Sequence, residues 1–344
     1  MKYSQSLRSR VASRWPKAFQ PLPVPQLAKE VIPMRSISTP LLRPEDISFF
    51  KENGYFTSQE LLDGRGIATL RTAVESVFSG NIDTNASPYE YKDWLVAVET
   101  CAEQGYFTRS ANDSSTARKV LKVNNSWWIN RQIRALLIDP ASPAANPQPS
   151  HFAMTIGRMA ADLLGVNEIR LWHDQVIVKP PGKGDQGNVG WHQDYAYWQL
   201  SSSSQMITAL IMLQDTSAHN GALQTVEKSH HWGLVYDEGD PGFFNPDLMG
   251  LQEKFCQLAE GRPWSVVTNA VGGGQITFHH SLTFHGSGPN HSHVPRLAIA
   301  IHMQSEQCRL RHGRGNHHNL RDLGPFANVG DRFDISSCPV LFRR

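Results

Sequence analysis

The chain has few cysteines, and they are scattered along its 344 residues. No CxxC pair occurs, so neither a disulfide scaffold nor a zinc knuckle is expected, and reduced thiols indicate an intracellular protein. The thiols are Cys101, Cys256, Cys308 and Cys338. No apolar run is long enough to span a membrane. A net charge of only +2 gives no electrostatic reason to expect a nucleic-acid partner.

Acidic residues are absent before Glu30, where basic residues and serines recur. This composition is typical of a mitochondrial presequence, and a disordered basic tail is the alternative. A secretory signal is excluded because no apolar segment follows the charges. Prolines recur between positions 18 and 42. We therefore expect residues 1–42 to be a basic, proline-rich segment, either disordered or a targeting peptide. The expected compartment is the cytoplasm or, if residues 1–29 act as a presequence, the mitochondrion.

The folded part is expected to begin at residue 43, and its first half reads as helical. Residues 44–53 predict a short helix ended by Gly54, and the capping-box spacing of Thr57 and Glu60 predicts the start of another. Ser150 is expected to cap a helix closed by Gly165. The polar stretch 81–118 shows weak periodicity and predicts loops with short elements.

From about residue 168 short β-type segments separated by turn residues take over. They lie at 169–179, 190–198, 206–215, 222–226, 264–269, 275–279 and 296–304, with one helix near 247–259. This pattern predicts an all-β barrel or a double-sheet sandwich. The expected fold is mainly β with α, in one domain over 43–344. Its parts are a helical region (43–167), a β-core (168–305) and a C-terminal extension (306–344).

The stretch GWHQDYAYW at 190–198 contains a possible metal-ligand pair. On an extended strand, residues two apart project from the same face, so His192 and Asp194 would point into one space. They are two of the three ligands of a 2-His-1-carboxylate triad, which holds non-haem Fe(II). On a regular strand Tyr195 and Tyr197 would face the opposite way and pack outside the site.

A third ligand and an anion-binding residue occur downstream, in FHGSGPNHSHVPR at 284–296. His285 can complete the triad, with Ser287 as a hydroxyl donor. Arg296 opens the strand RLAIAIHM, in which alternation places Ala298, Ala300 and His302 on the arginine's own face. Two alanines beside a guanidinium leave room for a small ligand, and the planar guanidinium suits a carboxylate. We expect His302 to be a satisfied interior histidine.

With these residues in place, the chain resembles the phytanoyl-CoA dioxygenase family of Fe(II)/2-oxoglutarate oxygenases. The segments occur in the family's order: DQVIVKPPG at 174–182, WHQD at 191–194, NGAL at 220–223, SHHWG at 229–233, HGSGPN at 285–290, and the arginine at 296. The likeness is specific over about residues 170–305 and looser from about residue 44. Glu227 and Lys228 depart from the family's usual Pro-Gly turn, and Gln275 replaces a common acidic residue.

The resemblance implies a double-stranded β-helix of the jelly-roll type. It implies His192, Asp194 and His285 as iron ligands, and Arg296 with Ser287 as the site for the distal carboxylate of 2-oxoglutarate. Lys179 matches a family lysine near the cosubstrate, and Gln193 matches the residue between the ligands.

The implied activity is hydroxylation of a small organic metabolite, with 2-oxoglutarate and O2 converted to succinate and CO2. Ascorbate is an optional cofactor, and an acyl-CoA is one candidate substrate. A carboxylate at Asp194 favours hydroxylation over halogenation, because it fills the iron position that chloride would need. Two alternatives stay open: a cupin-like enzyme using another metal without 2-oxoglutarate, and a non-catalytic ligand-binding relative. The sequence does not set the oligomeric state.

Overall fold

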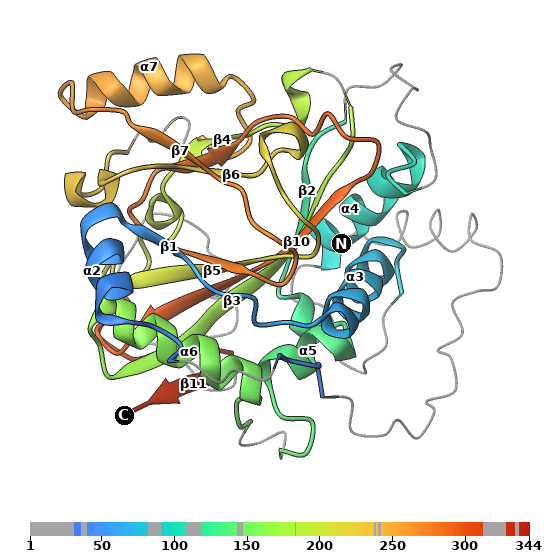
Figure 1. Ribbon diagram of the computed structural model, residues 1–344, viewed down its shortest axis with the longest axis horizontal. Helices are drawn as coiled ribbons and strands as arrows, with labels where there is room; N and C mark the ends of the chain where they lie inside the picture. The colour runs from blue at the N-terminus through green and yellow to red at the C-terminus, as the bar shows by residue number, and fades with distance from the viewer. Residues whose placement is uncertain are drawn as a thin grey trace.

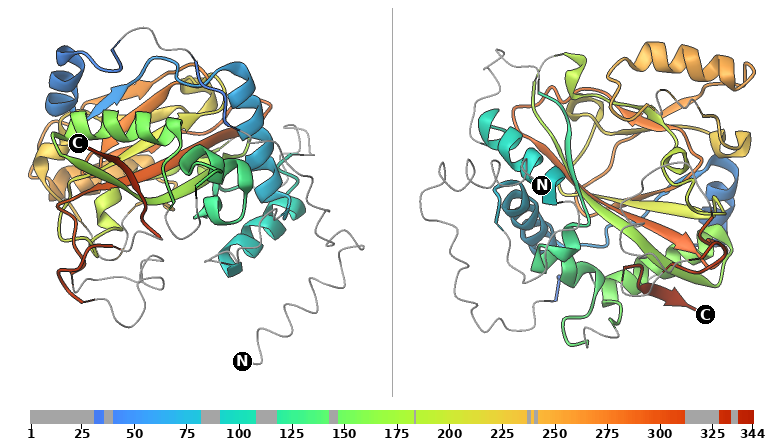
Figure 2. Two further views of the ribbon diagram at one scale, coloured as in Figure 1. Left: turned by 90° about the horizontal axis from the view of Figure 1, so that it is seen from below. Right: turned by 180° about the vertical axis from the view of Figure 1, so that it is seen from behind.

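The computed structural model describes residues 31–35, 40–81, 91–107, 118–142, 147–182, 184–236, 239, 242–311, 328–333 and 337–344. Two antiparallel sheets face each other, and helices cover the outer face of the larger one (Figures 1 and 2). This arrangement confirms the expected β-core with a helical N-terminal half, although the described strands form two open sheets and not a closed barrel. Among these residues no helix is long and apolar enough to cross a membrane.

The larger sheet is built around two long central strands. Its order is β1-β8-β5-β10-β3-β11, and β2 also pairs with β3. The strands are β1 (Tyr55–Thr57), β2 (Leu121–Asn124), β3 (Glu168–Lys179), β5 (Met206–Met212), β8 (Ile276–His280), β10 (Arg296–Ser305) and β11 (Val340–Arg343). One edge of β3 pairs with β10 along its length, while the other edge is shared by β2 and β11. This pairing fixes the positions of β10 side chains relative to β3 and β5.

The smaller sheet, in the order β4-β9-β6-β7, lies across from the larger one. Its strands are β4 (Val189–His192), β6 (Leu223–Val226), β7 (Val266–Asn269) and β9 (His285–Ser287). Helix α7 (Leu248–Leu258) covers it, and Leu251 and Phe255 of α7 pack with Trp191, Val226 and Phe284. The prediction of a helix near 247–259 is confirmed.

Helices lie over the outer face of the larger sheet (Figure 2, left), and their apolar side chains are buried against it. They are α2 (Pro44–Asn53), α3 (Gly64–Phe78), α4 (Tyr91–Glu103), α5 (Arg131–Leu137) and α6 (His151–Leu164). Ser150 caps α6 and Gly165 ends it, as predicted. Helix α3 instead begins after Asp63, whose carboxylate accepts from two backbone N–H groups, so the predicted capping box at Thr57 is wrong. Helix α4 lies in a stretch where we expected loops with short elements.

Short 3-10 helices connect several strands: η1 (Ser126–Trp128), η2 (Asp185–Gly187), η3 (Asp194–Ala196), η4 (Ala218–Asn220) and η5 (Ser229–Trp232). Lys228, at the altered family turn, caps η5 with a left-handed backbone (φ 64°) that favours glycine. Its N–H donates to the Asn53 carbonyl, and its ammonium pairs with Glu52, which offsets the strain. Lys228 therefore takes up at this turn a backbone conformation that glycine adopts without strain.

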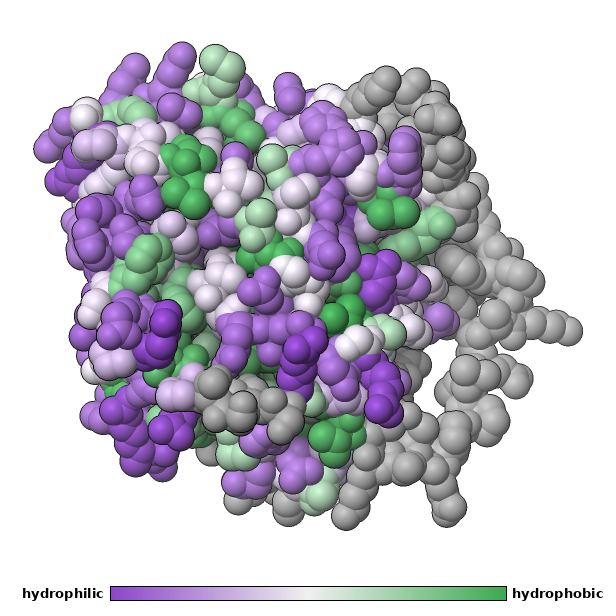
Figure 3. All heavy atoms as spheres, viewed as in Figure 1, coloured by the Kyte–Doolittle hydropathy of each residue, from purple (hydrophilic) through white to green (hydrophobic). Residues whose placement is uncertain are grey.

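Strand β10 confirms the predicted alternation. Leu297, Ile299, Ile301 and Met303 belong to the core between sheet and helices. Arg296, Ala300 and His302 instead line a pocket between the two sheets. The same strand therefore carries the fold's main core on one face and site residues on the other. On the face of the molecule in Figure 3, by contrast, apolar side chains are scattered among polar ones.

Both chain ends of the described domain are tied down. Ile32 is buried in the main core and Met34 bridges Leu62, so residues 31–35 of the predicted lead-in pack on the domain. At the other end, Arg343 of β11 pairs with the buried carboxylate of Glu168 on β3. The predicted presequence at 1–29 lies outside the described residues, and the domain boundaries remain predictions.

Acid should destabilise the metal-free protein through buried neutral histidines. Burial lowers the pKa of His280 to about 3 and that of His230 to about 4. His280 also accepts the Leu282 N–H at Nδ1, which requires a neutral ring. The unfolded chain binds protons below pH of about 6.5 and the folded chain does not, so the free energy of unfolding falls as pH decreases from 7.

We therefore predict that urea unfolding with a chelator present will show lower stability at pH 5 than at pH 7. His280→Asn should reduce this pH difference by roughly 2 kcal/mol, whereas a substitution of the exposed His293, His293→Asn, should not change it. An unchanged pH dependence in His280→Asn would contradict the assignment.

Candidate active site

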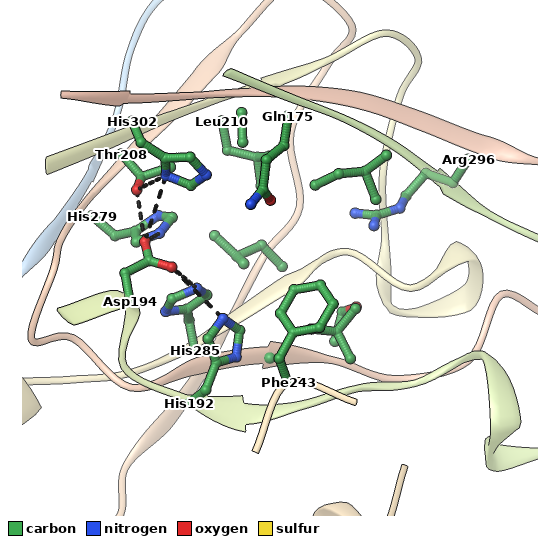
Figure 4. A pocket seen from close by; sticks show the side chains of 16 residues that line it. Gln175, His192, Asp194, Thr208, Leu210, Phe243, His279, His285, Arg296 and His302 are labelled. Atoms are coloured by element: carbon green, nitrogen blue, oxygen red, sulfur yellow. Dashed lines mark hydrogen bonds and ion pairs between the residues drawn. The ribbon is translucent and has the colours of Figure 1, made fainter. Parts of the chain in front are cut away.

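A pocket between the sheets contains most of the predicted site residues (Figure 4). It has about 510 Å³ of empty space, part of it open to solvent. His192, Asp194 and His285 lie at one end and Arg296 at the other, with apolar side chains between them. Its lining comprises Gln175, Ile177, Val189, His192, Asp194, Thr208, Leu210, Leu223, Phe243, His279, His285, Gly286, Ser287, Arg296, Ala300 and His302.

The three predicted ligands converge, but not by the geometry expected for the first two. Strand β4 ends at His192, and Asp194 begins the 3-10 turn η3. His285 opens β9 directly opposite His192 in the sheet. Oδ1 of Asp194 lies 3.7 Å from Nε2 of each histidine, and the three ligand atoms all lie within 4.8 Å of one another. The two histidines are paired by the smaller sheet, and the turn brings in the carboxylate.

The backbone prepares both histidines as neutral ligands. Nδ1 of His192 lies 2.8 Å from the Gly190 carbonyl, and Nδ1 of His285 lies 2.9 Å from the Thr283 carbonyl. A carbonyl can only accept, so each Nδ1 carries the proton and each Nε2 presents a lone pair. Burial lowers the pKa of His192 to about 4 and that of His285 well below its ordinary value. Both rings are therefore in the form that binds a divalent metal at neutral pH.

Asp194 supplies the negative charge. Burial acts to raise its pKa, but the nearby histidines, above all His285, hold that pKa well below the ordinary value. Two neutral imidazoles and a carboxylate around one space match the donor set of a 2-His-1-carboxylate iron site. The residues present therefore fit Fe(II).

Gly190 is required by close packing just before the first ligand. A Cβ at this position would lie 2.0 Å from the Gly242 carbonyl oxygen and 2.3 Å from that of Asn245. Both of these oxygens belong to backbone, which cannot swing aside as a side chain can. The glycine in GWHQD thus lets β4 run against the 242–245 segment and bring His192 to the pocket.

Arg296 forms the opposite end of the pocket and has unmet bonding capacity. It begins β10, and its side chain is 4% exposed. Burial lowers its pKa to about 10, so it remains charged at pH 7. Within the described part of the chain, its one side-chain hydrogen bond is a 3.8 Å contact from Nη1 to Met212 Sδ, and Nε has no partner. Buried guanidinium groups without an acceptor are costly, so an anionic ligand fits here.

Ser287 provides a second donor for such an anion. Its hydroxyl is buried, lines the same pocket and has no hydrogen-bond partner. Ala300 and Ile177 leave an apolar passage from this end toward the triad. A linear dicarboxylate would suit this shape, with one end at Arg296 and the other near the histidines.

Lys179 and Gln193 lie outside the pocket lining and have structural partners instead. Nζ of Lys179 donates to the Gly187 and Gly288 carbonyls at 2.6 and 2.7 Å. The side-chain amide of Gln193 donates to the Gly233 and Leu282 carbonyls and accepts the Val235 N–H. These contacts fix loops that surround the site, and the expected role of both residues near the cosubstrate stays a prediction.

The chain turns after His192, and the two tyrosines that follow both lie outside the pocket lining. Tyr195 packs away from the pocket, with its hydroxyl donating to the Ser201 carbonyl, as expected. Tyr197 instead lies with its ring centroid 6.0 Å from that of His192, and its hydroxyl accepts the Phe243 N–H. Tyr197 therefore packs on His192 and Phe243 from outside the pocket lining, as expected, although the strand does not continue past His192.

Several residues of the pocket were not predicted as site residues from the sequence. Phe243 stands edge-on to His192 at 5.0 Å between ring centroids, and Thr208 and His279 contact Asp194. Phe243 follows a loop, and nothing local marks it. His279 was visible only as one of several histidines near His285. His302, predicted as a satisfied interior histidine, contacts the Thr208 hydroxyl.

Comparison with known proteins agrees with this geometry. The family model for phytanoyl-CoA dioxygenase (PhyH) matches residues 50–298. The chain belongs to this family. A probable alpha-ketoglutarate-dependent hypophosphite dioxygenase of Stutzerimonas stutzeri is 31% identical over 167 residues, 46% of this chain and 53% of that protein. The peroxisomal phytanoyl-CoA dioxygenase of Homo sapiens is 28% identical over 144 residues, 41% of this chain and 40% of that protein. The chain thus spans about half or less of the length of these two relatives.

Solved structures support the fold. The non-heme alpha ketoglutarate dependent carbocyclase SnoK superposes with a TM-score of 0.58 at 20% identity, covering 87% of this chain and 96% of SnoK. The epimerase SnoN gives a TM-score of 0.54 at 17% identity, covering 86% and 97%. At this level of identity the likeness speaks for the shared double-sheet architecture.

The metal site predicts a clear binding phenotype. His192→Ala should weaken Mn(II) binding by more than about 100-fold, because losing a ligand costs more than losing an outer contact. His219→Ala, at an exposed histidine outside the pocket, serves as the control and should bind like wild type. Free Mn(II) measured by electron paramagnetic resonance reports the affinity. Equal affinity of His192→Ala and wild type would rule out this site.

Arg296 predicts a separate phenotype at the other end of the pocket. Arg296→Ala should weaken 2-oxoglutarate binding about 10- to 100-fold, the value of a charge-assisted hydrogen bond, and leave Mn(II) affinity nearly unchanged. Calorimetric titration of 2-oxoglutarate into Mn(II)-loaded protein measures this, with exposed Arg262→Ala as the matched control. Loss of metal affinity instead of 2-oxoglutarate affinity would contradict the assignment.

Proposed function

We propose that this protein is an Fe(II)- and 2-oxoglutarate-dependent dioxygenase that hydroxylates a small organic molecule. The observation that supports this most directly is the shared pocket: two neutral histidines and a carboxylate at one end, and a buried arginine and serine hydroxyl with unmet bonds at the other. Membership in the PhyH family and the alpha-ketoglutarate dependence named for its relative agree with this proposal.

The charges in the pocket indicate which residues would bind the metal and which would bind 2-oxoglutarate. When bound, iron and 2-oxoglutarate would supply the oxidising power, with O2 consumed and succinate and CO2 released. His192, Asp194 and His285 would hold the metal. Arg296 and Ser287 would bind the distal carboxylate and so orient the cosubstrate toward the metal.

The surrounding apolar side chains keep the space between the two polar ends free of competing hydrogen-bonding groups. Val189, Leu210, Leu223 and Phe243 line the space between the two polar ends, so little in it competes with the cosubstrate for hydrogen bonds. Exclusion of water from such a site strengthens the pairing of Arg296 with its ligand and limits unproductive reactions.

The choice of hydroxylation rests on Asp194. A carboxylate in the third ligand position occupies the place that a halide would need, which favours transfer of oxygen to the substrate. The relatives are named for substrates as different as hypophosphite and phytanoyl-CoA. Family membership therefore leaves the substrate open, and an acyl-CoA remains one candidate beside smaller metabolites.

The test is release of succinate from 2-oxoglutarate across a metabolite library that includes CoA esters. We predict that a true substrate will raise succinate release by at least about tenfold over the uncoupled rate, and that oxygen from ¹⁸O2 will enter both succinate and the hydroxylated product. His285→Ala should abolish both signals. Turnover without 2-oxoglutarate, or with Zn(II) in place of Fe(II), would instead support a cupin-like enzyme of another type.

A further inference from the structure

A row of polar residues crosses the larger sheet beneath Asp194. In the strand register, His279 on β8 stands opposite Thr208 on β5, Thr208 opposite His302 on β10, and His302 opposite His173 on β3. All four side chains are nearly inaccessible to solvent. Residues directly opposite each other in antiparallel strands share one face and interact. The row is therefore a continuous polar line at one level of the sheet.

This row makes direct contact with one oxygen of the Asp194 carboxylate. The Thr208 hydroxyl donates to Oδ2 at 2.7 Å, and Nε2 of His279 lies 3.2 Å from the same oxygen. Asp194 itself is held on the opposite side of the pocket, after β4 of the smaller sheet. The two contacts thus bridge the two sheets through a single carboxylate oxygen (Figure 4).

His302 orients the threonine. Its Nδ1 lies 2.7 Å from the Thr208 hydroxyl oxygen. A hydroxyl has one proton, and the carboxylate, which can only accept, takes it. The hydroxyl therefore accepts from His302, whose Nδ1 must carry a proton. The direction of every hydrogen bond from His302 to Asp194 is fixed by this chain of donors.

The other carboxylate oxygen is left for the histidine pair. Oδ1 lies 3.7 Å from Nε2 of both His192 and His285, whereas Oδ2 faces the larger sheet. A carboxylate can bind a metal through one oxygen or through two. Two hydrogen bonds on Oδ2 occupy its lone pairs and hold it away from the histidines.

We propose that Thr208, His279 and His302 are positioning residues that restrict Asp194 to binding the metal through Oδ1 alone. One-oxygen binding keeps a further metal position free for the cosubstrate. The inference rests on the proposed function, since it assigns these three residues a role toward the proposed metal ligand. Of the three, His279 also packs against the ring of His285, with 4.2 Å between the ring centroids.

Thr208→Val tests this, because valine keeps the shape and removes only the hydroxyl. We expect Mn(II) affinity, measured by electron paramagnetic resonance, to fall about 10- to 100-fold, the usual cost of losing a partner of a metal ligand. Thr208→Ser should restore it to near the wild-type value. Thr277→Val is the matched control: Thr277 is a buried threonine of β8 whose hydroxyl bonds Thr57.

A second measurement separates positioning from general packing. The visible spectrum of the Co(II)-loaded protein reports the ligand set. In Thr208→Val we expect a changed Co(II) spectrum and weaker binding of 2-oxoglutarate to the Mn(II) form, since Oδ2 becomes free to compete for the open position. Thermal melting of the metal-free protein should change no more than in Thr277→Val. His279→Leu removes the second donor to Oδ2 and should give the same change in the Co(II) spectrum. It replaces Thr208→Val as the test variant if Thr208→Val folds poorly.

Each outcome decides between the two proposals. Wild-type Mn(II) affinity and an unchanged Co(II) spectrum in both Thr208→Val and His279→Leu overturn the positioning role and leave the metal site intact. Failure of Thr208→Ser to restore affinity also overturns it. Absence of Mn(II) binding in the wild-type protein removes the proposed function and, with it, this inference.

Discussion

Burial of two opposite charges at the ends of one pocket is the constraint on which the site depends. The charge of Asp194 is stabilised where it stands by hydrogen bonds from Thr208 and His279 of the larger sheet. Arg296 has almost no such compensation from the described residues. An unpaired buried charge costs several kcal/mol, so the fold carries that cost until a ligand arrives. Binding of an anion would remove the free-energy cost of the unpaired Arg296 guanidinium, and this gain contributes to the affinity for the anion.

The two sheets divide the work of building the site. The smaller sheet supplies His192 and His285 as a directly opposed pair, and the larger sheet supplies Arg296 and the row around Thr208. The distance between the metal end and the arginine end is therefore set by how the sheets pack. Apolar contacts between them, among them Val189 and Leu223 with Ile177 and Ala300, hold that spacing. Such close packing leaves little freedom for the separation to vary.

Local patterns in the sequence were enough to find the ends of the pocket. Alternation along β10 correctly separated Arg296 and His302 from the core-facing residues, because a strand buried on both faces still has a period of two. The helix start at Ser150 was likewise readable, since capping involves neighbours in the chain. The fold class followed from the succession of short strands after a helical half.

The features of the site that the sequence did not predict depend on pairing between distant strands, or on a turn that ends a strand early. The polar row exists only because β8, β5 and β10 align in one register, and no local pattern gives that register. The geometry of Asp194 was inferred from a continued strand, whereas the chain turns after His192. His192 and Asp194 still converge despite that turn, and Tyr195 and Tyr197 still lie outside the pocket lining. Helix α4 was not predicted, because the stretch in which it lies is polar and weakly periodic.

Lys179, which stands at a family position, links the two sheets through its ammonium group. It stands opposite Arg296 in the β3–β10 ladder, so two cationic side chains begin at the same level of the sheet. Burial, with the nearby Arg296, lowers the pKa of Lys179 well below its ordinary value. Its Nζ turns to the carbonyls of Gly187 and Gly288, on the segments leading into β4 and out of β9. Gly221, whose backbone φ is +74° and whose Cβ would lie 2.8 Å from Lys179 Cδ, leaves the space for that path. The lysine thereby ties the larger sheet to both ligand-bearing strands of the smaller one, and Arg296 is left as the cation that faces the pocket.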